Sequence, residues 1–190
     1  MVQEARLERL SSGVAPTTEG WFVVNVRDAA WLTHETFGRR SIFESDGRMT
    51  RERPDFKAVP FEHLGVKLAV VQPGQPSTMY HAETAQEGFL VLAGECLLLV
   101  EDEERRMRAW DFFHCPGGTA HAFVGAGDRP CVILMVGARP AEGSIVYRVS
   151  ELARRHDAGV EEETDDPHEA YRPFGHWRLG RPATWEGLPW

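Results

Sequence analysis

Short apolar runs alternate with turn residues through the middle of the chain. From residue 61 onward these runs are about four to eight residues long, and Gly, Pro, Asp or Glu bounds them. Runs of this length, separated by regular turn signals, predict strands of an all-β sandwich or barrel. The strands we expect are 66–71, 87–92, 96–100, 105–108, 112–115, 121–124 and 131–136.

The N-terminal part of the chain has a less regular pattern. Residues 4–10 could form a helical turn or two, but Gly and Pro soon follow, so we expect 1–18 to be a flexible arm or to dock on a partner subunit. The run 21–26 is a strand candidate, and 41–43 is a weaker one. Residues 48–60 are polar and contain proline, which is typical of a loop over the mouth of a barrel.

The C-terminal part begins with an expected strand at 144–149 and a short helix at 150–156. Ser150 is suited to cap the start of this helix, and Gly159 is suited to end it. Residues 161–190 begin with an acidic run and then hold too many aromatic side chains for a simple disordered tail. We expect this tail to wrap around the barrel or around a twin subunit.

Length and composition limit the classes of protein. A chain of 190 residues predicts one domain with extensions, namely the arm at 1–18, a single barrel at 19–160 and the tail at 161–190. A net charge of −8 argues against a nucleic-acid partner, which requires a basic surface. The chain has no apolar run of ~18 residues and no apolar leader, so we expect a cytoplasmic protein without membrane contact. Its three cysteines fit a reducing compartment as buried free thiols.

The first group of candidate metal ligands lies near residue 81. Side chains alternate between the faces of an extended strand, so His81, Glu83 and Glu87 share one face. Phe89 continues the same face and would line the interior beside them. One imidazole and two carboxylates would therefore point into the barrel.

One further candidate ligand follows a glycine-rich turn. Pro-Gly-Gly at 116–118 is a strong turn signal, and His121 lies just beyond it with Phe123 on the same face. Two imidazoles and two carboxylates suit one divalent transition metal, either Mn²⁺, Fe²⁺, Zn²⁺ or Ni²⁺. The alternative is that these residues are polar side chains on a β-rich surface, as a lone histidine near a turn usually is.

The two segments resemble the paired motifs of the cupin superfamily, in its single-domain bacterial form. The family's first motif is a Gly, a short run, His-x-His, a gap, Glu, a gap and Gly; its second is Gly-Asp, a gap, Pro-x-Gly-x-x-His, a gap and Asn. The matching positions here are Gly74, His81, Glu83, Glu87 and Gly94, then Trp110, Asp111, Pro116, Gly118, His121 and Gly125. The resemblance implies a jelly-roll cupin barrel with the ligands clustered inside.

Three positions depart from the family pattern. Trp110 stands where the family has Gly, Gly125 where it has Asn, and Glu83 where it usually has a second His. The first two affect turns. The third places two carboxylates on the metal, which lowers its Lewis acidity and favours Mn²⁺ or Fe²⁺ modestly, with Zn²⁺ still open.

The resemblance leaves the activity open. A small-molecule enzyme of the oxygenase, decarboxylase or isomerase type is one reading, with Glu83 or Glu87 doubling as a base. A non-catalytic cupin that binds a metal or small molecule is the other, and a metal that only braces the fold is a third. The sequence assigns no catalytic residue, and we expect a homodimer from the family and the aromatic tail.

We expect Phe89, Phe123 and Met135 to line the pocket because of their parity. An apolar lining would favour an aromatic or small organic substrate over a sugar phosphate, and no cluster of inward Arg or Lys is evident. Cys115 flanks the turn before the second histidine and could approach the site, while His114 has the opposite parity in its strand and is expected at the surface or between sheets.

Overall fold

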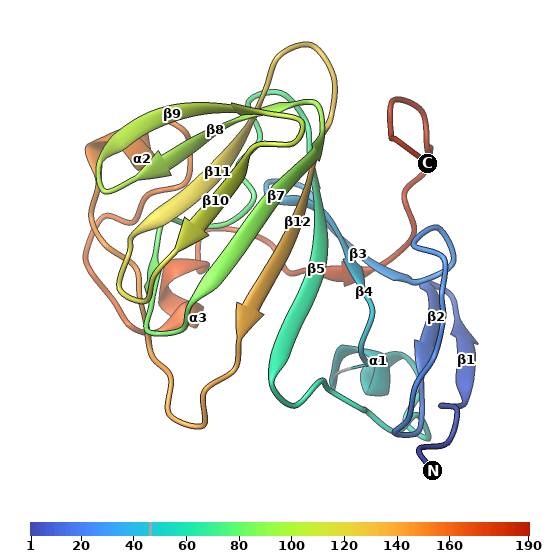
Figure 1. Ribbon diagram of the computed structural model, residues 1–190. Helices are drawn as coiled ribbons and strands as arrows, with labels where there is room; N and C mark the ends of the chain where they lie inside the picture. The colour runs from blue at the N-terminus through green and yellow to red at the C-terminus, as the bar shows by residue number, and fades with distance from the viewer. Residues whose placement is uncertain (46) are drawn as a thin grey trace.

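Two β-sheets form the body of the protein in the computed structural model, which describes residues 1–45 and 47–190 (Figure 1). The larger sheet has the strand order β10-β7-β12-β5-β4-β3-β14 and the smaller one β11-β8-β9. The larger sheet comprises β3 (Ala30–His34), β4 (Gly38–Ile42), β5 (Leu64–Val71), β7 (Glu87–Ala93), β10 (Phe112–Cys115), β12 (Cys131–Ala138) and β14 (Arg178–Leu179). The smaller one comprises β8 (Glu95–Val100), β9 (Glu103–Arg108) and β11 (His121–Ala126).

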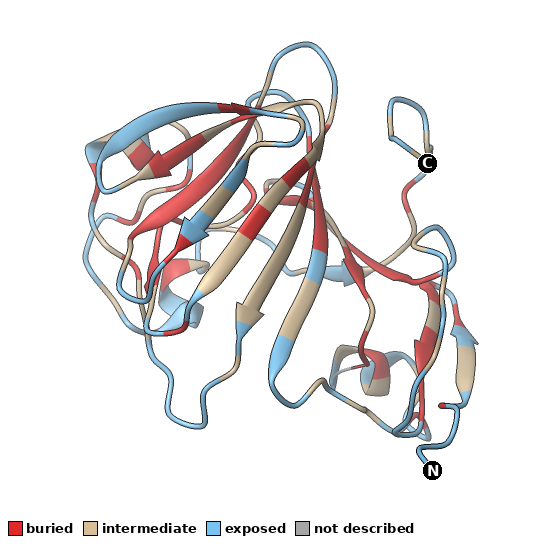
Figure 2. Cartoon of the chain, in the orientation of Figure 1, coloured by how far each residue is buried: buried red, intermediate tan, exposed pale blue. Residues whose placement is uncertain are grey.

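The main core lies between these two sheets, because buried side chains of both belong to one cluster. Figure 2 shows the buried residues along the strands of both sheets. Along the larger sheet, the antiparallel register puts Phe89, Met135 and Lys67 opposite one another on three neighbouring strands. Phe123 of the smaller sheet packs against Phe89 with ring centroids 4.9 Å apart. All strand pairs within the two sheets are antiparallel, and the architecture is all-β, as the apolar pattern predicted, and a jelly roll, as the family resemblance implied.

The strands predicted between residues 66 and 136 are all present, most of them one or two residues longer than expected. The local pattern of apolar runs and turns was sufficient to predict these strands, although β12 pairs with strands far from it in the chain. The three cysteines are buried and free, as predicted.

The N-terminal part differs from the prediction. Residues 4–10 form no helix; instead β1 (Leu7–Leu10) and β2 (Gly13–Pro16) pair as a hairpin. Leu10 and Ala15 are buried against β3 and β4, so this segment packs on the body of the protein. Packing of its apolar side chains on this surface stabilises the hairpin, whereas an isolated short helix in water is only marginally stable.

Three other expectations in this part are wrong or incomplete. Residues 21–26 form no strand; Trp21 makes only an isolated bridge with Glu4, and Val23 remains 85% exposed. The weak strand at 41–43 is the end of β4, whose partner β3 was not predicted at all. Within 48–60, α1 (Gly47–Glu52) is a short helix that buries Met49.

The segment after the barrel follows the prediction more closely. The strand expected at 144–149 is reduced to β13 (Ile145–Val146), which pairs with β6 (Ala82–Glu83). The side chain of Ser150 caps α2 (Glu151–Arg154) by accepting a hydrogen bond from Ala153 N at 3.1 Å. The predicted end at Gly159 is wrong, because the left-handed residue after the helix is Asp157, with φ of 55°.

The C-terminal tail packs along the barrel. Its first half contains α3 (Pro167–Ala170), and β14 then adds to the edge of the larger sheet beside β3. Trp185 and Trp190 lie against the fully buried Trp31, with ring centroids 5.5 and 6.1 Å away. Among the described residues, no helix is long and apolar enough to cross a membrane. The division into arm, barrel and tail stays a prediction.

Candidate metal centre

His81 and His121 lie opposite each other where β11 meets the segment leading into β6. Their main chains exchange two hydrogen bonds, His81 N to His121 O at 3.2 Å and His121 N to His81 O at 2.9 Å. The imidazole centroids are 5.0 Å apart, and both side chains are buried. The backbone pairing therefore sets the separation of the two rings.

Each imidazole is oriented by a main-chain carbonyl. The Nδ1 atom of His81 lies 2.7 Å from Met79 O, and that of His121 lies 3.2 Å from Thr119 O. A carbonyl oxygen only accepts hydrogen bonds, so Nδ1 carries the proton in both rings. A neutral ring protonated at Nδ1 presents the Nε2 lone pair, which is the arrangement that metal-binding histidines use.

Glu87, at the start of β7, offers a third potential ligand atom. Its Oε2 atom lies 3.4 Å from Nε2 of His121, is buried and has no hydrogen-bond partner among the described residues. A Cβ atom at Gly137, directly opposite on β12, would lie 3.4 Å from Glu87 Oε1, so this glycine leaves room for the carboxylate. Burial together with the nearby charge of Glu83 raises the pKa of Glu87 to about 7.

The three groups fit a divalent cation. His81, Glu87 and His121 each offer one ligand atom, and these atoms lie within 4.8 Å of one another. Burial, followed by the charge of His81, lowers the pKa of His121 to about 4, so its ring is neutral near pH 7. The buried, unpartnered oxygen of Glu87 beside two imidazoles lacks a compensating positive charge, which Mn²⁺, Fe²⁺, Zn²⁺ or Ni²⁺ would supply.

Glu83 lies beside this group. Its Oε1 atom is 3.5 Å from Nε2 of His81, and the proximity of His81 is the main reason that the pKa of Glu83 is lowered. Its carboxylate is outside the set of atoms that lie within 4.8 Å of one another. Its role as a fourth ligand therefore stays a prediction.

The glycine-rich turn docks the second ligand segment onto the first. Gly118 N donates to Glu83 O at 2.6 Å, and a Cβ at Gly117 would lie 2.2 Å from Thr84 O. Only glycine permits that approach, since any side chain would overlap the neighbouring main chain. The turn thus holds His121 against the segment that carries His81 and Glu83.

A cavity of about 280 Å³ opens beside the ligand atoms. The three pocket residues expected from the sequence, Phe89, Phe123 and Met135, all line it. Phe89 also packs on the imidazole of His121, with ring centroids 5.0 Å apart. One side of the cavity is therefore apolar, as expected.

The expectation that no cluster of inward Arg or Lys lines the cavity is wrong. Arg40, Lys67 and Arg139 line the cavity, together with Tyr147 and Tyr171. Lys67 had a readable signal, because it is the single charged residue of the otherwise apolar strand β5. The others had none, since Arg40 lies on a strand that was only partly predicted and Tyr171 in the tail.

The remaining candidates have minor roles in this geometry. Cys115 is buried with Sγ 3.5 Å from His121 Nδ1, and burial raises the pKa of its thiol to about 12, so it is a protonated neighbour of the site. His114 is exposed on β10, in agreement with its parity.

A jelly-roll barrel with two facing histidines and a buried glutamate defines a class of metal-site proteins, and comparison with known proteins names the family. Residues 67–137 match the family model of the cupin domain. The barrel therefore contains a cupin domain at residues 67–137. No curated protein matches it significantly.

Solved structures similar to the chain include proteins with different activities. A sugar phosphate isomerase of the cupin superfamily from Silicibacter pomeroyi is 20% identical, with 78% of this chain and 83% of that one covered and a TM-score of 0.46. The polyketide cyclase RemF from Streptomyces resistomycificus is 17% identical, with 65% and 83% covered and a TM-score of 0.49. The DMSP lyase DddQ from Ruegeria pomeroyi is 25% identical, with 48% and 46% covered and a TM-score of 0.40.

Proposed function

We propose that the protein is a cupin enzyme that binds one divalent transition metal at His81, Glu87 and His121 and acts on a small molecule in the adjoining cavity. The observation that carries this proposal is the convergence of the two Nε2 atoms and one unpartnered carboxylate oxygen. Both Nδ1 atoms are already occupied by carbonyl oxygens, so the free nitrogen of each ring faces the same point.

The bound metal would supply Lewis acidity toward an oxygen of the substrate. The chain supplies the surroundings. Phe89 and Phe123 line the cavity beside the ligands and help to exclude water, and Tyr147, whose ring centroid is 5.8 Å from that of His81, lines it as well. Burial raises the pKa of Tyr147, so its hydroxyl stays protonated and can donate a hydrogen bond to a substrate oxygen.

Glu83 is the candidate proton acceptor of the site. Because its pKa is lowered, the carboxylate is ionised near pH 7, and it lines the cavity next to His81. In this position it can either complete the ligand set or accept a proton from the substrate. A carboxylate can act as a general base where it lies within hydrogen-bond reach of the substrate.

The cavity separates this proposal from a purely structural metal. A metal that only braces a fold is typically enclosed by four protein ligands, whereas the three ligand atoms here border a space of about 280 Å³. A non-catalytic cupin that only binds a small molecule would have the same geometry, and turnover assays distinguish it. Oxygen uptake and isomerase assays on the metal-loaded protein cover two of the reaction types expected from the sequence.

Metal analysis of the purified protein tests the proposal. We expect close to one equivalent of a transition metal in the wild-type protein and a sharp loss in His121→Ala. His114→Ala is the matched control, because this histidine is exposed on the neighbouring strand β10. Equal metal content in both variants would remove His121 from the site and contradict the proposal.

A further inference from the structure

Two cations line the cavity from neighbouring strands. Lys67 lies on β5 and shares the inward face with Met135, which is directly opposite it on β12. Arg40 lies on β4 opposite Ala69, two positions along β5 from Lys67. Diagonal positions on one face of a sheet are roughly 7–8 Å apart, within reach of long side chains. Arg40 and Lys67 therefore form a pair of positive charges on one cavity wall.

Lys67 has no counter-charge in contact with it. Among the described residues, its ammonium makes no hydrogen bond and no ion pair, although its side chain remains accessible through the cavity. Desolvation is the main cause that lowers the pKa of Lys67 to about 8, and the charges of Arg40 and Arg48 lower it further. The more distant carboxylates of Glu44 and Glu83 act in the opposite direction and offset only part of this.

Arg40 is fixed in place without a carboxylate. Its guanidinium lies 4.3 Å from the ring centroid of Trp177, and its Nη2 atom donates to Ser77 O at 2.5 Å. Its Nε atom is buried and has no hydrogen-bond partner among the described residues. The aromatic ring and the carbonyl hold the guanidinium, but neither neutralises it.

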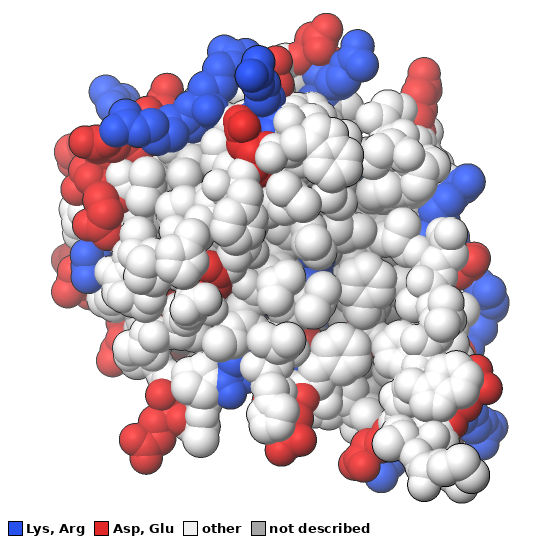
Figure 3. All heavy atoms as spheres, in the orientation of Figure 1, with Lys and Arg blue, Asp and Glu red and all other residues white. Residues whose placement is uncertain are grey.

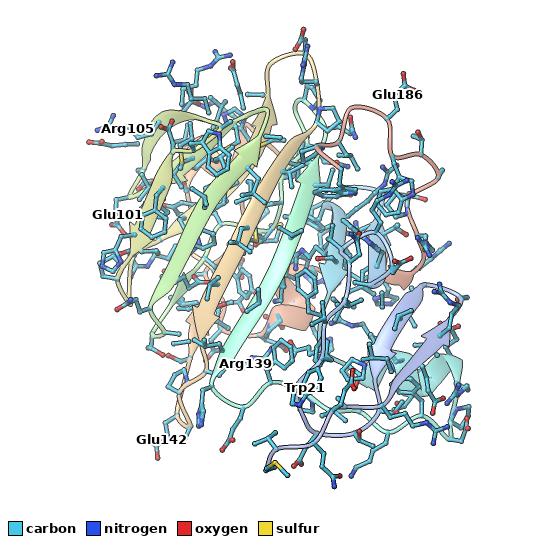
Figure 4. The ribbon with its side chains drawn as sticks, turned by 45° about the vertical axis from the view of Figure 1, so that its right-hand side comes forward. Trp21, Glu101, Arg105, Arg139, Glu142 and Glu186 are labelled. Carbon is cyan, nitrogen blue, oxygen red and sulfur yellow. The ribbon has the colours of Figure 1, made fainter. Side chains whose placement is uncertain are left out.

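Arg139 is different, although it also lines the cavity. It lies at the end of β12 (Figure 4), and its Nη1 atom donates to Glu44 Oε2 at 2.6 Å, so a buried carboxylate already pairs with it. The unpaired positive charge is therefore concentrated at Lys67 and Arg40. Two adjacent cations with too little counter-charge destabilise a folded protein, and residues that do so at a cavity are functional candidates.

We propose that Lys67 and Arg40 form a subsite that binds an anionic group of the substrate, either a carboxylate or a phosphate, so that the adjoining part of the substrate reaches His81, Glu87 and His121. The assignment of this group to a substrate rests on the proposed function. Binding of the anion itself needs only the two cations. The cavity of about 280 Å³ lies at the small end of ligand pockets, which fits a small anionic metabolite.

Calorimetric titration of the metal-free protein with inorganic phosphate and, separately, with succinate tests the subsite. We expect at least one of them to bind, and Lys67→Met to weaken that binding at least ~10-fold, because a charge-assisted hydrogen bond is lost. Lys67→Arg keeps the charge and should retain binding within a few-fold. Lys57→Met is the matched control, because Lys57 is the other lysine of the chain and is exposed.

The variants also separate this inference from the metal proposal. Lys67→Met should fold, because among the described residues no group loses a hydrogen-bond partner when Lys67 is replaced. A thermal melt of the variant checks this. We expect His121→Ala to lose metal and still bind the anion. Phosphate binding alone assigns a phosphate group, and succinate binding alone assigns a carboxylate. The inference is overturned if neither anion binds, or if Lys67→Met binds it as tightly as Lys57→Met does.

Discussion

His81 and His121 are joined by two main-chain hydrogen bonds, and this places their imidazole rings 5.0 Å apart. Further hydrogen bonds connect His81 to Met79 and Met79 to Tyr171. Met79 O orients the ring of His81, and Met79 N donates to the hydroxyl of Tyr171 at 3.2 Å. The candidate metal centre is thereby connected to the C-terminal tail.

Deletion of 161–190 should destabilise the protein and loosen the site. The tail supplies Tyr171 beneath His81, Trp177 against Arg40, and Trp185 and Trp190 over Trp31. Exposing these surfaces should cost roughly 3 kcal/mol or more of the free energy of unfolding. Denaturant unfolding followed by tryptophan fluorescence measures the loss. An unchanged midpoint in the truncated protein would show that the tail is dispensable.

Glu87→Gln should weaken metal binding far more than Glu83→Gln. The Glu87 carboxylate belongs to the group of candidate ligand atoms within 4.8 Å of one another. The Glu83 carboxylate is outside this group and contacts the imidazole of His81. Since loss of a residue that merely supports a ligand costs about 10–100-fold, loss of Glu87 should reach or exceed that range. Competition with a chelator of known affinity measures both variants. Equal losses would place Glu83 among the ligands, as the sequence predicted.

Trp110→Gly should stabilise the protein. Trp110 occupies a left-handed conformation with φ of 76°, which strains the main chain of the turn. Its side chain is 75% exposed, so the substitution loses little packing. Relief of this conformation should contribute about 1 kcal/mol. Trp110→Ala is the control, because alanine keeps the strain. If both variants unfold at the same denaturant concentration, the strain is absent.

We propose that the outer face of the larger sheet associates with a second copy of the chain. This face, over β7, β12 and β5, is largely free of charge (Figure 3), and Leu64, Trp110 and Phe112 are exposed apolar residues at its strands and turns. An uncharged face with exposed large apolar side chains is typical of an interaction site. Phe112→Glu should shift a dimer toward the monomer in light scattering. A wild-type protein that is monomeric at all concentrations would refute the association.

The sequence predicted the barrel and the ligand face because both depend on local pattern. Alternation along a single strand predicted His81, Glu83 and Glu87 on one face, whereas the structure divides this segment between β6 and β7 and groups Glu87, but not Glu83, with the two histidines. The cationic wall depends instead on register between strands far apart in the chain, and Arg40 meets Lys67 only through the pairing of β4 with β5. The N-terminal hairpin was missed for the same reason, since its stability comes from packing on β3 and β4.

X-ray absorption spectroscopy of the metal-loaded protein tests the central claim most directly. The structure predicts two imidazole rings in the ligand shell and otherwise only oxygen ligands. The same spectrum is expected after Cys115→Ser, because Cys115 contacts His121 at Nδ1, on the side away from the site. A sulfur ligand, or a shell with fewer than two imidazoles, would contradict the assignment of His81, Glu87 and His121 as the metal centre.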